Sequence, residues 1–133
     1  MVTSYKGTQM IEQWLEEIKR TAEPAELGMI LVHNGIVRGT SKRGEEVTKM
    51  RLTYDAPGLE KLIGEYRRNE GIVGIKAWIN SGELSVGDDI MLVLVAGRFR
   101  TDVLPVFESL IGKIKREIVS EREIKPDPQG EDL

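Results

Sequence analysis

The chain has 133 residues, a formal net charge of −3, one histidine and no cysteine, and its 40% hydrophobic and 31% charged residues suit one soluble globular domain. The missing cysteines exclude a disulfide scaffold, a cysteine nucleophile and a persulfide on this chain, and one histidine cannot form a multi-histidine metal site, so we expect neither metal nor cofactor. The acidic balance argues against a dedicated nucleic-acid binder, and the lack of a long apolar run or a visible secretory signal predicts a cytoplasmic protein without membrane contact.

The first half of the chain predicts one helix followed by two strands. Apolar residues recur at spacings of three and four over 8–21, which predicts an amphipathic helix. Residues 27–37 are almost continuously apolar, as is typical of a buried strand. After a polar loop over 39–46, apolar and polar residues alternate over 49–54, so this strand should bury one face only.

The second half predicts a helix, two strands and a last helix. Pro57 suits the first turn of a helix. Apolar residues alternate over 73–79, and residues 90–96 form an apolar run that is the best candidate for a central strand. A last helix should cover about 101–118. The predicted order is therefore αββαββα.

This order predicts an α+β fold in a single domain over residues 1–124. Residues 125–133 contain two prolines, a glycine and three acids, which is typical of a flexible acidic tail.

Two loops carry possible sites. The segment Gly35–Lys42 superficially resembles a phosphate-binding loop, but three residues separate its glycines where four are needed, and a strand follows where a helix is needed. A cationic cluster of Arg38, Lys42 and Arg43 is left, which could hold a small anion. For Lys42 and Arg43 a solvated loop is the better interpretation.

The second loop is Gly82–Asp88, which joins two predicted strands. Gly82 and Gly87 suit positive φ in such a connection. Glu83 could act in catalysis, but a turn carboxylate more often bonds backbone amides, and we expect that structural role.

Cations also follow the predicted central strand and lie in the last helix. Arg98 and Arg100 flank Phe99 at the strand's carboxyl end, where ligand-binding groups often collect. Lys115 falls at the border of the apolar stripe of the last helix, whereas Arg116 faces solvent. Lys115 either extends its ammonium to solvent or lines a pocket in which desolvation adjusts its chemistry.

Taken together, these motifs resemble those of one family, the large, catalytic subunit of molybdopterin synthase. The resemblance covers about 27–123 and rests on Gly35-Ile-Val-Arg38, Leu52-Thr-Tyr-Asp55, the turn Gly82-Glu-Leu-Ser-Val-Gly-Asp88, and Ile114-Lys115. The turn is the most specific of these signals.

The sequence departs from the family's pattern at several functional positions. Phe99 stands where the family has histidine, Ile79-Asn80 where it has His-Arg, and Glu121 where it has an aromatic residue. Arg122 replaces the family's second lysine, and arginine keeps the charge but cannot act as a base near neutral pH. The chain therefore resembles a divergent member.

The resemblance implies a fold of the α/β-hammerhead type and a sulfur transferase of molybdenum cofactor biosynthesis. Sulfur would come from the thiocarboxylated Gly-Gly tail of a small ubiquitin-like subunit and go to cyclic pyranopterin monophosphate, forming the molybdopterin dithiolene. The family also implies a homodimer, which forms a heterotetramer with the small subunits.

The implied site residues follow the motifs. Lys115 would be the main catalytic group, and Arg122 would substitute for the second lysine as a fixed charge. Arg38 and Arg100 would hold the phosphate, with Arg98 and Phe99 beside them as substrate-binding residues.

Two alternatives remain. The first is a non-catalytic paralogue that acts as a dimeric binding module for a ubiquitin-like partner or a small anion. The second is a nucleic-acid contact through the cations of residues 38–51, which the acidic total and the few aromatic residues disfavour.

Overall fold

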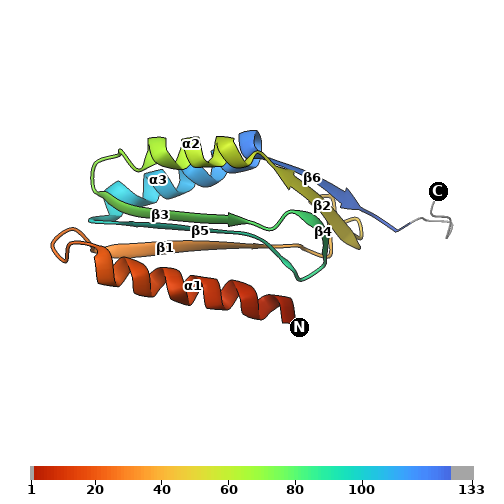
Figure 1. Cartoon of the computed structure of the whole chain (residues 1–133). Helices are drawn as coiled ribbons and strands as arrows, with labels where there is room; N and C mark the ends of the chain where they lie inside the picture. The colour runs from red at the N-terminus through yellow and green to blue at the C-terminus, as the bar shows by residue number, and fades with distance from the viewer. Residues whose placement is uncertain (1, 127–133) are drawn as a thin grey trace.

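A computed structural model describes residues 2–126 of the chain, with side chains from residue 6 onward. Its main layer is a three-stranded antiparallel sheet in the order β1-β5-β3 (Figure 1). These strands span Met29–Ile36 (β1), Asp89–Gly97 (β5) and Ile72–Ile79 (β3). The strand β5 therefore lies in the centre of the layer, as the apolar run predicted.

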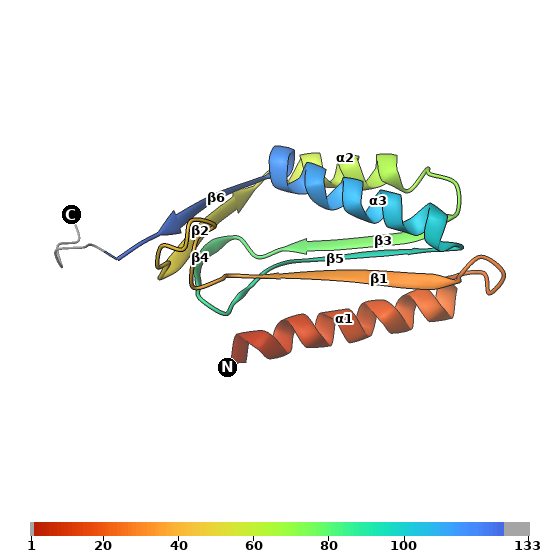
Figure 2. The same ribbon diagram turned by 180° about the vertical axis from the view of Figure 1, so that it is seen from behind.

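Helices cover both faces of this sheet. The helix α1 (Val2–Thr21) lies on one face, and α2 (Ala56–Tyr66) and α3 (Arg100–Lys113) lie on the other (Figure 2). Asp55 caps α2 by accepting a 3.0 Å hydrogen bond from the Gly58 amide. No helix in the described part of the chain has the length and apolar character needed to cross a membrane.

A second antiparallel sheet stands beyond the end of the main sheet at which β1 ends and β5 begins (Figure 1). Its order is β4-β2-β6, with bounds Gly82–Ser85 (β4), Lys49–Tyr54 (β2) and Val119–Ile124 (β6). We call it the small sheet. A π-helical turn, η1 (Ile114–Ile118), connects α3 to β6.

The core is built around β5, whose residues 91–97 are all buried. Its side chains alternate between two clusters. Leu94 and Ala96 pack with Ile18 of α1, whereas Val93 and Val95 pack on the side of α2 and α3. Full burial of each large aliphatic side chain contributes about 1.5–3 kcal/mol, so this strand supplies much of the fold's stability.

Several sequence predictions are confirmed. β2 buries Met50 and Leu52 and exposes the residues between them, so one face only is covered, as predicted. Gly82 and Gly87 have φ of 118° and 95°, which confirms the positive φ expected there. The fold is α+β with antiparallel sheets, as the sequence predicted.

Other predictions need correction. The first helix begins at Val2 instead of residue 8. The first strand is not fully buried: Val32 and Ile36 are 36% and 52% exposed, because β1 lies at the edge of the sheet, where the helices cover it less completely than β5.

The order of elements also differs from αββαββα. The turn over residues 82–88 contains the strand β4, and the last helix ends at Lys113, so that the π turn and β6 follow. Of the predicted tail over 125–133, the part from 127 onward lies outside the described residues.

His33 is an anomaly in the packing. It lies on β1 opposite Val93, on the face of the sheet that α3 and η1 cover. Its Nε2 is buried and has no hydrogen-bond partner among the described residues. Burial, and second the positive charge of Lys115, lower the pKa of His33 below its usual 6.5.

This site predicts how stability depends on pH. The unfolded chain takes up a proton on this histidine near pH 6.5, whereas the folded chain does so only at lower pH. The neutral histidine's contribution to the free energy of unfolding is therefore fully present above about pH 6.5, and it is lost as the pH falls toward the folded-state pKa. Urea unfolding at pH 7.5, 6.5 and 5.5 should show the loss in the wild type.

The matched variant is His33→Phe, which keeps an aromatic side chain but removes the unpaired nitrogen. It should be more stable than the wild type by about 1 kcal/mol at pH 7.5, because a buried polar group without a partner is lost. The difference should grow as the pH falls to 5.5. Equal pH dependence in the two proteins would contradict this account.

Candidate functional site at the two ends of the sheet

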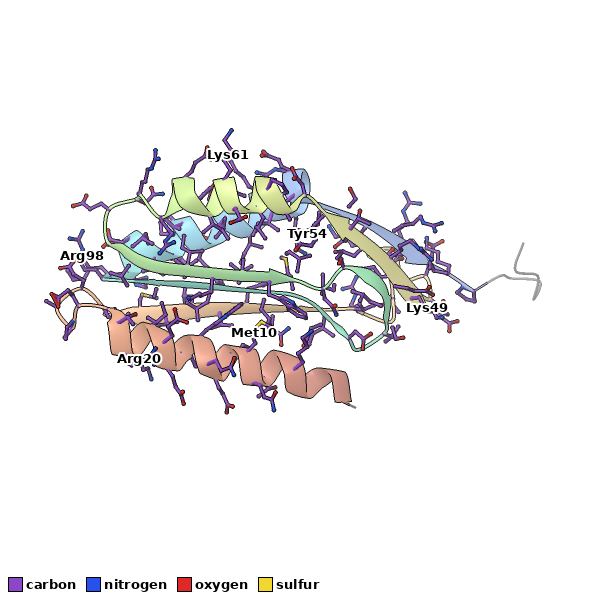
Figure 3. The ribbon with its side chains drawn as sticks, viewed as in Figure 1. Met10, Arg20, Lys49, Tyr54, Lys61 and Arg98 are labelled. Carbon is purple, nitrogen blue, oxygen red and sulfur yellow. The ribbon has the colours of Figure 1, made fainter. Side chains whose placement is uncertain are left out.

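The predicted site residues divide between the two ends of the main sheet. β1 and β5 are antiparallel, and Met29 pairs with Gly97. Arg38, which follows β1, therefore lies at the opposite end from Arg98 and Arg100, which follow β5. Figure 3 shows the separation, with Arg98 labelled at one end and Lys49, close to the loop that follows β1, at the other.

The separation is too large for one phosphate. β1 contains eight residues, which corresponds to about 26 Å. Within one chain Arg38 and Arg100 are therefore roughly 25 Å apart. The expectation that both contact the same phosphate is thus wrong for a single chain, and the reason is the antiparallel pairing.

At the end of β5, Arg98 already has two carboxylate partners. Its Nε lies 3.0 Å from Oδ2 of Asp102, and its Nη2 lies 3.4 Å from Oε2 of Glu70. The hydrogen bond that Arg98 donates to Asp102 is the main reason why the pKa of Arg98 is raised. Its guanidinium also lies 5.0 Å from the centre of the Phe99 ring. Arg98 therefore links the strand exit to the start of α3.

Phe99 and Arg100 are open to solvent. Phe99 occupies the N-cap position of α3 without a side-chain cap, and 58% of its surface is exposed. Arg100 is the exposed first residue of α3. Leu104, one turn further on, is 38% exposed, so this end presents an apolar surface beside a cation.

Lys115 lies on the π-helical turn. Ile114 and Ile118 of this turn are buried, whereas Lys115, Arg116 and Glu117 are exposed. The positive charge of Lys115 contributes to the lowered pKa of His33 on β1. π turns inserted in α-helices occur frequently at functional sites. Lys115 is thus an accessible cation whose charge acts on the half-buried His33, and it lies toward the end of the sheet that carries Arg38.

Arg38 is exposed, and its Nε donates a 2.8 Å hydrogen bond to the carbonyl of Thr40. The neighbouring loop forms one wall of a groove of about 390 Å³. The groove is lined by Ser41, three cations and three carboxylates, namely Lys42, Arg43, Lys125, Glu45, Glu121 and Glu123. Because these charges balance, the structure favours the interpretation of Lys42 and Arg43 as a solvated loop.

Arg122 lies on β6 directly opposite Arg51 of β2. Glu83 of β4 lies opposite Arg51 on the other side and bonds Lys49 at 3.1 Å and Arg51 at 3.4 Å. The hydrogen bond from Lys49 is the main cause of a lowered pKa of Glu83. The backbone amides predicted as the partners of Glu83 are not its partners in the structure, because its carboxylate pairs with two side chains across the small sheet.

The sequence alone did not connect Arg51 with Arg122. The predicted last helix ends at about residue 118, and the residues after it indicate only a departure from the family's motif, so nothing in the pattern showed that residues 119–124 form a strand beside β2. Only the pairing of β2 with β6 brings the two arginines together.

Comparison with known proteins places this arrangement in a family. Residues 8–117 match the family model of the MoaE protein, a range that includes Arg38, Arg98–Arg100 and Lys115 but ends before Arg122. An uncharacterized protein of Methanocaldococcus jannaschii is 32% identical over 93 residues, which cover 67% of this chain and 78% of that protein.

Solved structures show the same fold. Molybdopterin synthase from Staphylococcus aureus superposes with a TM-score of 0.68 at 22% identity, over 82% of each chain. A complex of subunits 1 and 2 of the molybdopterin-converting factor from Helicobacter pylori has a TM-score of 0.69 at 18% identity, over 96% of this chain and 88% of that one. The fold that the motifs implied is confirmed, and the chain belongs to the MoaE protein family.

Proposed function

We propose that the chain is the large subunit of a molybdopterin synthase, or a close relative, and acts in molybdenum cofactor biosynthesis. It takes sulfur from the thiocarboxylated Gly-Gly tail of a small ubiquitin-like subunit and transfers it to cyclic pyranopterin monophosphate. The observation that carries the proposal is the family match across 8–117, within which Lys115 stands exposed on the π turn. The two-subunit complex from Helicobacter pylori supports a small partner protein.

The chemistry needs no sulfur bound to this chain. In each transfer the thiocarboxylate sulfur forms a bond to a carbon of the pterin side chain, and a carbon–oxygen bond of that same carbon breaks, so that its oxygen substituent leaves. Water then cleaves the bond between the sulfur and the carrier's acyl carbon, which leaves the sulfur on the pterin and returns the carrier's tail as a carboxylate. Lys115 supplies a proton donor or acceptor at the attacked carbons, and the arginines stabilise the negative charges. Arg122 contributes a fixed charge only, because guanidinium does not release its proton near neutral pH.

The two ends of the sheet imply a site shared between two copies. Arg100 and Lys115 are about 20 Å apart along α3 and η1, so they cannot serve the same reacting group within one chain. In a homodimer the strand exit of one copy, with Phe99 and Arg100, would approach Lys115 and Arg38 of the other. The exposed Phe99 and Leu104 supply apolar surface for such a contact.

The second candidate function is the non-catalytic binding module. Phe99 in place of the family's histidine favours it, since a phenyl ring cannot exchange protons. Arg122 in place of lysine favours it as well. The fold and the dimer would be kept, and sulfur transfer would be absent.

Lys115→Met tests the enzymatic role. The fold and the oligomeric state should be unchanged because the side chain is exposed on the π turn, whereas the rate of dithiolene formation should fall about 100-fold or more. Lys115→Arg should not restore the rate, since guanidinium keeps the charge but holds its proton. The rate is measured with a thiocarboxylated small subunit, with Arg116→Met as the control on the same turn. An unchanged rate in Lys115→Met would show that Lys115 takes no part in dithiolene formation.

Arg122→Lys tests the departure from the family. It restores the family's residue at this position and should maintain or raise the rate of dithiolene formation. If the wild type forms no dithiolene with any thiocarboxylated partner and Arg122→Lys does not create activity, the binding module is the correct function.

A further inference from the structure

Arg98, labelled in Figure 3, joins the end of β5 to two segments that are distant in the sequence. Its amide donates a 2.8 Å hydrogen bond to the carbonyl of Gly71, in the loop before β3. Its guanidinium forms ion pairs with Glu70 of the same loop at 3.4 Å and with Asp102, in the first turn of α3, at 3.0 Å. We call the guanidinium contacts with Asp102 and Glu70 the exit clamp. They connect the strand exit to the loop and to the helix that starts beside it.

Asp102 is the stronger partner in the exit clamp. The side chains of Arg98 and Asp102 are 27% and 18% exposed, whereas that of Glu70 is 85% exposed. Solvent therefore screens the pair with Asp102 less than the pair with Glu70. Gly71 makes room for this pair, because a Cβ on it would collide with the Asp102 carboxylate, and its φ of 81° also favours glycine. The local backbone thus accommodates the contact between Arg98 and Asp102.

The exit clamp occupies the charge of Arg98. One guanidinium faces two carboxylates, so the net charge of the three groups is −1. A phosphate that approached Arg98 would be repelled by Asp102 or would have to displace it. Arg100, two residues further on, is exposed, and no carboxylate within residues 6–126 forms an ion pair with it. Arg100 is therefore the arginine of this exit that is available to an anion.

The start of α3 depends on the exit clamp because its N-cap residue gives little support. Phe99 occupies the N-cap position without a side-chain cap hydrogen bond, where a hydroxyl or carboxylate would bond an amide of the first turn. Asp102 places a negative charge in that turn, which the helix dipole favours. The guanidinium of Arg98 lies 5.0 Å from the centre of the Phe99 ring, a distance typical of a cation–π contact. One side chain therefore holds both the ring and the first turn.

We propose that Arg98 is a positioning residue and not a substrate ligand. Its pair with Asp102 fixes the direction in which Phe99 and Arg100 leave β5. The proposal rests on the proposed function for the substrate that Phe99 and Arg100 meet, whereas the exit clamp is a property of the free chain. The two possible roles of Arg98 predict opposite effects of Asp102→Ala. If Arg98 positions its neighbours, losing Asp102 weakens substrate binding. If Arg98 contacted the phosphate, losing Asp102 would release its charge and strengthen binding.

Fluorine nuclear magnetic resonance tests the exit clamp without any reaction. The chain has two phenylalanines, Phe99 and Phe107, so incorporated fluorophenylalanine gives two resonances, which Phe107→Leu assigns. Asp102→Ala should shift the Phe99 resonance and leave that of Phe107 in place, because Arg98 loses the partner that holds it beside the ring. Glu65→Ala removes an exposed acid of α2 and should move neither resonance. An unmoved Phe99 resonance in Asp102→Ala would overturn the proposal.

Substrate affinity gives the second measurement. Asp102→Ala and Arg98→Ala should each raise the KM for cyclic pyranopterin monophosphate about tenfold, the size of one lost charge-assisted hydrogen bond, while kcat stays within about twofold. The double variant should bind no more weakly than either single variant, because both changes break the same contact. Glu65→Ala and Arg68→Ala, which remove exposed charges at this end of the sheet, should leave KM unchanged. A lower KM in Asp102→Ala, or additive losses in the double variant, would make Arg98 a substrate ligand and overturn the proposal.

The result can be told apart from that of the proposed function. If the wild-type chain forms no dithiolene, the proposed function fails, and the dissociation constant of the pterin phosphate, measured by calorimetry, replaces KM with the same expected order of variants. The fluorine resonances need neither substrate nor partner. Thermal unfolding shows which variants are folded. If Arg98→Ala is not, Arg98→Lys takes its place, and KM should rise less because lysine keeps a charge beside Asp102.

Discussion

The antiparallel pairing of β5 with β1 and β3 determines where every candidate site residue lies. β5 is buried by α1 on one face and by α2 and α3 on the other, so it cannot shift without disrupting both clusters of the core. Because its neighbours run against it, residues that follow β5 emerge where β1 begins. The cations of this chain are consequently divided between two ends, and Arg38 and Arg100 cannot meet within one copy.

The π turn and the small sheet determine where the remaining site residues, Lys115 and Arg122, lie. Ile114 and Ile118 anchor the turn in the core, which leaves Lys115 exposed. After the turn the chain forms β6, which pairs with β2 and places Arg122 opposite Arg51. The residue that replaces the family's second lysine thus belongs to a cationic sheet face with its own carboxylate, Glu83, as well as to the end that carries Lys115.

The hydrophobic pattern was sufficient to predict the elements that bury regular faces, such as the apolar run of β5 and the one-sided strand β2. It could not predict β6, because four consecutive residues of this strand are exposed and its pairing with β2 is a tertiary contact. The four residues of β4 were too short to separate from their turn. The sequence pattern also could not show that Arg38 and Arg100 lie at opposite ends of the sheet within one copy, because this follows from the antiparallel pairing of β1 with β5. The sequence pattern also did not indicate that the buried Nε2 of His33 has no hydrogen-bond partner among the described residues.

We propose that two copies of the chain complete the site whose residues are divided between the ends of the sheet. Mixing Arg100→Ala with Lys115→Met tests it most directly, after subunit exchange between the two inactive dimers. A shared site predicts that dithiolene formation returns to about a quarter of the wild-type rate, because half of the dimers are mixed and each of these holds one complete site. If the mixture forms no dithiolene although mass spectrometry shows mixed dimers, the site lies within one chain and the claim is contradicted.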